Sequence, residues 1–119
     1  MLFLYYPGCI SCRRAKQWLD ARGVAYTPRL IREEPPTAEE LRAWRDASGL
    51  PLKRFFNTSG KRYAALGLKD RLPEMTDDEQ LALLAGDGML VKRPLLIDGA
   101  RVLIGFKAAE WEEFFAPAP

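Results

Sequence analysis

The chain's two cysteines, Cys9 and Cys12, lie three positions apart in the stretch YYPGCISCR, behind a Pro-Gly turn and ahead of two arginines. A pair with this spacing can exchange thiols and disulfides, bind a metal ion, or pack in a core as two small apolar side chains. The chain has no histidine, which excludes Ser-His-Asp and Cys-His catalysis and any histidine-ligated metal. Two cysteines provide too few ligands for a structural zinc site, so redox chemistry is favoured over packing and over metal binding.

The residues around the pair predict a strand that turns into a helix. LFLYY at residues 2–6 is a short apolar run typical of a strand buried on both faces, and Pro7-Gly8 stops it. Apolar residues then follow a helical period from 10 to 22, and Gly23 can end that helix. The cysteines are therefore expected on the first helical turn.

This position suggests a different role for each cysteine. Unpaired backbone N–H groups and the positive end of the helix dipole stabilise a thiolate at a helix N-terminus. We therefore expect Cys9 to be the exposed nucleophile and Cys12, one turn further on, to be the resolving thiol that attacks a mixed disulfide on Cys9. Arg13, followed by Arg14 and Lys16, adds positive charge nearby.

The rest of the pattern predicts a second strand at 24–31, a long helical stretch, a β-hairpin and a final helix at 108–116. Capping boxes at Thr37–Glu40 and Thr76–Glu79 predict two helix starts, with short helices between them broken at 57–60 and at Gly67. The hairpin strands are LLI after Pro94 and ARVLIGF, joined by Asp98-Gly99.

This order of elements predicts an α/β chain with a thioredoxin-like fold and an all-helical insertion, about residues 37–88, between the second and third strands. With 119 residues, of which 48% are hydrophobic, the chain can form one domain over 1–119 with its own core.

Charge and composition narrow the classes of partner. The 18 basic and 16 acidic residues are interspersed, which is typical of a solvated surface and gives no indication of direct nucleic-acid binding. The opening MLFLYYPGC lacks the features of an export leader or a membrane span, so we expect a cytosolic protein without a membrane partner. Residues 57–61 lack the spacing of a phosphate-binding loop.

Several longer stretches resemble the arsenate reductase and Spx-type (ArsC-like) family of small bacterial proteins. They are YYPGCISCRRAKQWLDARG, PPTAEEL, LPLKRFFNTSGKRYAALGLKD and DGMLVKRPLLIDGARVLIGF, which together cover nearly the whole chain. The phrases FFNTSGKRY and GDGML are closer to the reductase-like, uncharacterised branch than to the regulators.

The resemblance implies a thioredoxin-like domain with an all-helical insertion, a nucleophilic cysteine in the first loop, here Cys9, and an arginine before a proline beside it, here Arg93 and Pro94. In the thioredoxin fold that proline is cis, so a cis peptide is expected between Arg93 and Pro94, with its loop packed against Cys9. The Arg93 guanidinium would then stabilise the thiolate or an anionic substrate.

The chain also departs from the glutaredoxin-coupled arsenate reductases that it resembles. Those enzymes hold their oxyanion with two further arginines, at positions occupied here by Asn57 and Phe106. Since an oxyanion is bound largely by charge-assisted arginine contacts, we expect little arsenate reduction. Those enzymes also commonly have a serine where this chain has Cys12.

Two functions follow from the pattern and the resemblance. The first is a thiol–disulfide oxidoreductase acting on a thiol or disulfide substrate, with no resident cofactor or metal and with glutathione or glutaredoxin as a candidate co-substrate. The alternative is an Spx-type regulator that binds RNA polymerase and uses the Cys9–Cys12 pair as a redox switch.

Overall fold

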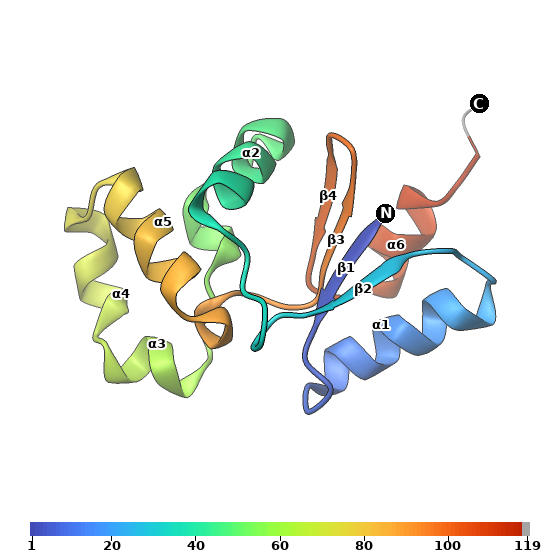
Figure 1. The fold of residues 1–119 in the computed structure, drawn as a ribbon, viewed down its shortest axis with the longest axis horizontal. Coiled ribbons are helices and arrows are strands. Elements are labelled where there is room, and N and C mark those ends of the chain that lie inside the picture. The colour runs from blue at the N-terminus through green and yellow to red at the C-terminus, as the bar shows by residue number, and fades with distance from the viewer. Residues whose placement is uncertain (118–119) are drawn as a thin grey trace.

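The computed structural model describes residues 1–117, which form a four-stranded mixed sheet with helices packed on both faces (Figure 1). The strand order is β2-β1-β3-β4. Strand β1 (Leu2–Tyr5) runs parallel to β2 (Thr27–Leu30) and antiparallel to β3 (Leu95–Asp98), and β3 pairs antiparallel with β4 (Arg101–Ile104). Helix α1 (Ile10–Ala21) connects β1 to β2, and α6 (Ala108–Phe114) follows β4. The predicted α/β fold is confirmed.

Strand β1 lies inside the sheet, and its side chains alternate between two apolar cores. Phe3 packs with Leu96 and with residues of α1 and α6, whereas Leu4 packs with Leu95 and the helices between β2 and β3. Phe3 and Leu4 are both fully buried, as the apolar run at residues 2–6 predicts. The end of β1 and the start of α1 are therefore held from both sides.

All the elements between β2 and β3 are helices, so the predicted all-helical insertion is confirmed (Figure 1). The insertion contains α2 (Ala38–Ser48), η1 (Leu52–Phe55), α3 (Lys61–Ala65), α4 (Leu68–Arg71), η2 (Leu72–Glu74), α5 (Asp77–Gly86) and η3 (Gly88–Leu90), where η denotes a 3-10 helix. Both predicted capping boxes form, at Thr37 with Glu40 and at Thr76 with Glu79. The last helix of the insertion, η3, ends at Leu90, two residues beyond the predicted boundary at 88.

Strand β2 and the hairpin turn differ from the prediction. Strand β2 covers only 27–30 of the expected 24–31, and it lies at a sheet edge, where the missing N–H of Pro28 is tolerated. In the hairpin, Asp98 still pairs with Arg101, so the two-residue turn is Gly99-Ala100 and not Asp98-Gly99. The left-handed conformation, with φ of 59°, falls on Gly99, the residue that adopts it most easily.

The loop before β3 is held by backbone contacts to the insertion. An isolated bridge joins Phe56 to Val91, the Asn57 N–H donates to the Leu90 carbonyl at 2.7 Å, and the Lys92 N–H donates to the Phe55 carbonyl at 2.8 Å. These bonds fix the direction in which the chain enters Arg93 and Pro94.

Candidate functional site

Cys9 is the N-cap residue of α1, one position before the first helical turn on which both cysteines were expected. Its backbone is extended, with φ of −93° and ψ of 124°, and its N–H donates to the Tyr6 carbonyl at 3.0 Å. The residue is half-buried and its thiol is free. Because Pro7 and Gly8 in front of it are exposed, the turn leaves Cys9 open to a partner on that side.

Cys12 is fully buried, and its thiol is also free. The Tyr6 N–H donates to Cys12 Sγ at 3.4 Å, across the turn. Burial raises the pKa of Cys12 to about 12, an effect reinforced by the neighbouring Cys9 and opposed by the Tyr6 N–H and the Arg93 charge. At neutral pH Cys12 is therefore a protonated, shielded thiol.

The structure has the predicted cis peptide between Arg93 and Pro94. The half-buried Arg93 donates from Nη1 to the carbonyls of Met89 at 3.1 Å and Val91 at 3.4 Å. Its guanidinium carbon lies 5.5 Å from the centre of the Tyr6 ring, and its Nε is buried without a hydrogen-bond partner. Arg93 thus lies beside the residue whose N–H contacts Cys12, within electrostatic reach of that thiol.

Arg13, also expected near the site, contributes a backbone contact. Its N–H donates to the Cys9 carbonyl at 3.0 Å as part of the first helical turn, and the residue is exposed. Within residues 1–117 its side chain forms no ion pair.

Asn57 and Phe106, the two departures from the reductase pattern, are both uncharged. The Phe106 ring packs edge-on against Trp111, with centroids 5.1 Å apart, as part of the apolar core on the α1 and α6 side. Asn57 uses its backbone to link the insertion to η3 and to begin the turn before α3.

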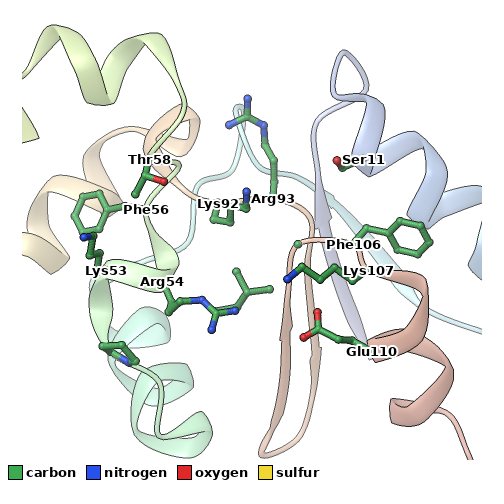
Figure 2. A pocket seen from close by; sticks show the side chains of 13 residues that line it. Ser11, Lys53, Arg54, Phe56, Thr58, Lys92, Arg93, Phe106, Lys107 and Glu110 are labelled. Carbon is green, nitrogen blue, oxygen red and sulfur yellow. The ribbon is translucent and has the colours of Figure 1, made fainter. Parts of the chain in front are cut away.

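Sequence reasoning missed two features. Tyr6 joins Cys12 to Arg93, yet a tyrosine at the end of an apolar run indicates only core packing. The second is a cavity of about 540 Å³ between the insertion and the β4–α6 connection, lined in part by Ser11, Arg54 and Lys107 (Figure 2). We call it the basic hollow. Its residues come from segments distant in the chain and have no spacing pattern.

Neither a metal-binding cluster nor a membrane-spanning helix is present in the part of the chain that the structure describes. No group of three or more histidine, cysteine or acidic side chains there is placed to hold a metal ion. No helix there is long and apolar enough to cross a membrane.

Comparison with known proteins places this geometry in a family. The model of the ArsC family matches residues 4–114, which include both cysteines, the insertion and the Arg93-Pro94 loop. The chain belongs to the ArsC family.

Among curated members of the ArsC family, the uncharacterised protein YusI of Bacillus subtilis is 52% identical over 116 residues, covering 98% of both chains. The global transcriptional regulator Spx of Enterococcus faecalis is 32% identical over 96% of this chain and 86% of its own. A crystal structure described as a possible arsenate reductase from Streptococcus mutans is 48% identical over 96% of this chain and 97% of its own, with a TM-score of 0.88. The family thus includes proteins named both for reduction and for regulation.

Proposed function

We propose that the protein is a thiol–disulfide oxidoreductase in which Cys9 is the nucleophile and Cys12 is the resolving thiol. One observation carries the proposal: the half-exposed Cys9 caps α1 behind an exposed turn, and Cys12 is fully buried one turn further on. The open position suits attack on an external sulfur. The buried position protects Cys12 from the substrate and keeps it for the internal step.

The reaction consists of two exchanges. The Cys9 thiolate attacks one sulfur of a substrate disulfide, so that a Cys9–substrate disulfide forms, the substrate S–S bond breaks and one substrate thiolate leaves. Cys12 then gives its proton to water, and its thiolate attacks Cys9 Sγ, which forms the Cys9–Cys12 disulfide and releases the second substrate thiolate. The substrate gains two electrons and the protein dithiol loses them.

A second thiol system must return the protein to its reduced form. Two thiol equivalents, from glutathione directly or through glutaredoxin, reduce the Cys9–Cys12 disulfide and are themselves oxidised to a disulfide. This cycle uses no resident cofactor, and the Arg93 charge near Cys12 favours anionic sulfur there.

Steady-state reduction of hydroxyethyl disulfide with glutathione, glutathione reductase and NADPH tests this proposal. NADPH oxidation that depends on the protein and disappears in Cys9→Ser supports it. A rate equal to the rate without protein, with or without added glutaredoxin, contradicts it.

A second candidate function follows from the relatives named as regulators. The similarity to Spx of Enterococcus faecalis extends over 96% of this chain. Under this alternative the protein binds RNA polymerase, and formation of the Cys9–Cys12 disulfide alters the binding surface. Affinity capture from a lysate of the source organism, with reduced and with oxidised bait, distinguishes the two. Retention of polymerase subunits that changes with bait oxidation favours the regulator.

A further inference from the structure

The basic hollow lies between the insertion, the start of α1 and the β4–α6 connection (Figure 2). Ser11 lies between the two cysteines in sequence, on the first turn of α1. It lines one wall of the cavity. The insertion supplies the opposite wall through η1, and the β4–α6 connection closes the third side. Neither cysteine lines the cavity, and Ser11 and Arg93 connect it to the pair. A substrate whose sulfur is at Cys9 can therefore place its other end here.

The lining of the basic hollow is strongly positive. Five cations line it, namely Lys53, Arg54, Lys92, Arg93 and Lys107, against one acid, Glu110. Arg54 from η1 and Lys107 from the β4–α6 connection point toward each other from opposite walls (Figure 2). A concave surface lined by one sign of charge focuses the potential, so this cavity attracts anions much more strongly than a net charge of +2 implies.

These cations also lack counter-ions, unlike many others in the protein. None of the five forms an ion pair within the described residues. On the far parts of the insertion, by contrast, Arg42 pairs with Asp78, Arg45 with Asp77, and Arg62 with Asp87. Like charges gathered without counter-ions repel one another, and a bound polyanion would relieve that repulsion.

We propose that the basic hollow recognises the substrate's anionic part, and that the substrate is a disulfide carrying two or more carboxylates close to its sulfurs. This inference rests on the proposed function and specifies its substrate class. The cavity volume of about 540 Å³ lies in the range of about 300–1,000 Å³ typical of small-molecule sites. Glu110 at the same wall can accept from an ammonium group, which suits a substrate built from amino acids.

The same positive charges also favour the thiol–disulfide exchange itself. The first step releases a substrate thiolate beside the cavity, and the surrounding cations stabilise the negative charge that the leaving sulfur acquires. Every substrate disulfide gains this stabilisation of its leaving thiolate, and one that carries carboxylates is also attracted to the cavity before the reaction.

The test compares three small disulfides of similar size: dithiodipropionate, which is anionic, hydroxyethyl disulfide, which is neutral, and cystamine, which is cationic. The second-order rate of Cys9 oxidation is measured for each and divided by the rate with a free cysteine peptide. The corrected rates should fall in that order, with the anionic compound at least about tenfold faster than the neutral one at low salt. The difference should shrink as the ionic strength rises from about 0.01 M to about 1 M.

A double variant, Arg54→Glu with Lys107→Glu, changes two exposed cations on opposite walls. It should lower the ratio of anionic to neutral rates by at least about tenfold. Lys61→Glu with Lys69→Glu, two exposed cations that do not line the basic hollow, lowers the net charge by the same amount. This double variant is the matched control and should leave the ratio within about twofold.

The disulfide-linked dimer of an acidic cysteine tripeptide separates the two sources of such a substrate. A faster reaction with this dimer than with dithiodipropionate indicates a peptide, and a slower one indicates a smaller dicarboxylate. Equal corrected rates for the three charge types, unchanged in the double variant, would overturn the inference while leaving the proposed function intact. If none of the three oxidises Cys9, both the inference and the proposed function fail.

Discussion

The two cysteines have different environments although only two residues separate them. Cys9 ends an exposed turn and caps a helix, whereas Cys12 lies in the core and receives the Tyr6 N–H. Helical geometry produces this difference, because the cap residue remains outside the helix while the residue three positions later turns toward the sheet. The contrast suits a nucleophile and its resolving partner.

Selective alkylation tests this contrast in the reduced protein. At pH 7, iodoacetamide should modify Cys9 at least about a hundredfold faster than Cys12, since Cys12 is buried and protonated. Peptide mass analysis of a time course measures both rates, and the protein unfolded in guanidinium is the control, in which the two should react alike. Equal rates in the folded protein would show that the assigned roles are wrong.

The raised pKa of Cys12 predicts the pH dependence of the internal step. Attack requires the thiolate, and burial keeps the pKa of Cys12 well above neutrality, so the thiolate fraction grows as pH rises. After a rapid first exchange with dithiobis(nitrobenzoate), release of the second aromatic thiolate should accelerate about tenfold per pH unit between about pH 7 and 9. Stopped-flow absorbance measures this concentration-independent phase, which Cys12→Ser should lack. A rate that is flat across this window would contradict the buried-thiol assignment.

The candidate site could be predicted from the sequence as far as its local pattern extends. The spacing of Cys9 and Cys12 behind Pro7-Gly8 indicates a strand-to-helix junction, and the position of Arg93-Pro94 follows from the family resemblance. The burial of Cys12 and its contact with the Tyr6 amide depend on how α1 packs on the sheet. The types and spacing of the residues do not indicate that packing.

At the level of elements, the junction between the insertion and the sheet positions the site. Gly88 in η3 lies so close to Ile31, the residue after β2, that an added Cβ would be 1.9 Å from the Ile31 carbonyl oxygen. Two hydrogen bonds then hold the following residues against η1 before the chain reaches Arg93. A shift at Gly88 would therefore move the loop that faces Cys12.

Gly88→Ala should destabilise the protein by about 3 kcal/mol, since the contacted atoms are backbone and cannot move aside. Gly86→Ala is the matched control, because a Cβ there meets nothing within 4 Å and alanine favours the helix by up to about 1 kcal/mol. Urea unfolding of both variants measures the difference. Equal stabilities would show that η3 does not pack against Ile31 in this way.

Elements with a local signal were predicted well. The capping boxes at Thr37 and Thr76 form because a side chain and a backbone N–H three residues later satisfy each other without help from the rest of the fold. The hairpin turn was misplaced by one residue, because Asp98-Gly99 is a favoured turn pair but the pairing of Asp98 with Arg101 fixes the register. Register depends on which residues must face the core, and a dipeptide does not carry that information.

At the level of the whole molecule, the basic hollow is the feature least visible in the sequence. Its cations come from η1, the loop before β3 and the β4–α6 connection, and they meet only when the insertion folds back over the sheet (Figure 2). The near balance of 18 basic and 16 acidic residues hides this local excess. Composition therefore predicts a neutral surface where the fold produces a positive cavity.

The two departures from the reductase pattern predict poor arsenate reduction. Phe106 is packed against Trp111 and Asn57 is uncharged, so neither offers the charge-assisted contacts that hold an oxyanion. With glutathione and glutaredoxin, arsenate turnover should fall at least about a hundredfold below an ordinary enzymatic rate of about ten per second. NADPH-coupled assays beside a known glutaredoxin-linked arsenate reductase measure it. Turnover comparable to that enzyme would refute the expectation.

The most direct measurement of the central claim is the number of substrate thiolates released by the reduced protein and its two cysteine variants. With excess dithiobis(nitrobenzoate), the unmodified chain should release two thiolates and end with a Cys9–Cys12 disulfide in peptide mass analysis. Cys12→Ser should release one and retain a mixed disulfide on Cys9, and Cys9→Ser should react far more slowly than either. If Cys9→Ser reacts as fast as the unmodified chain, or if the unmodified chain ends with a stable adduct on each cysteine, the two-cysteine mechanism is wrong.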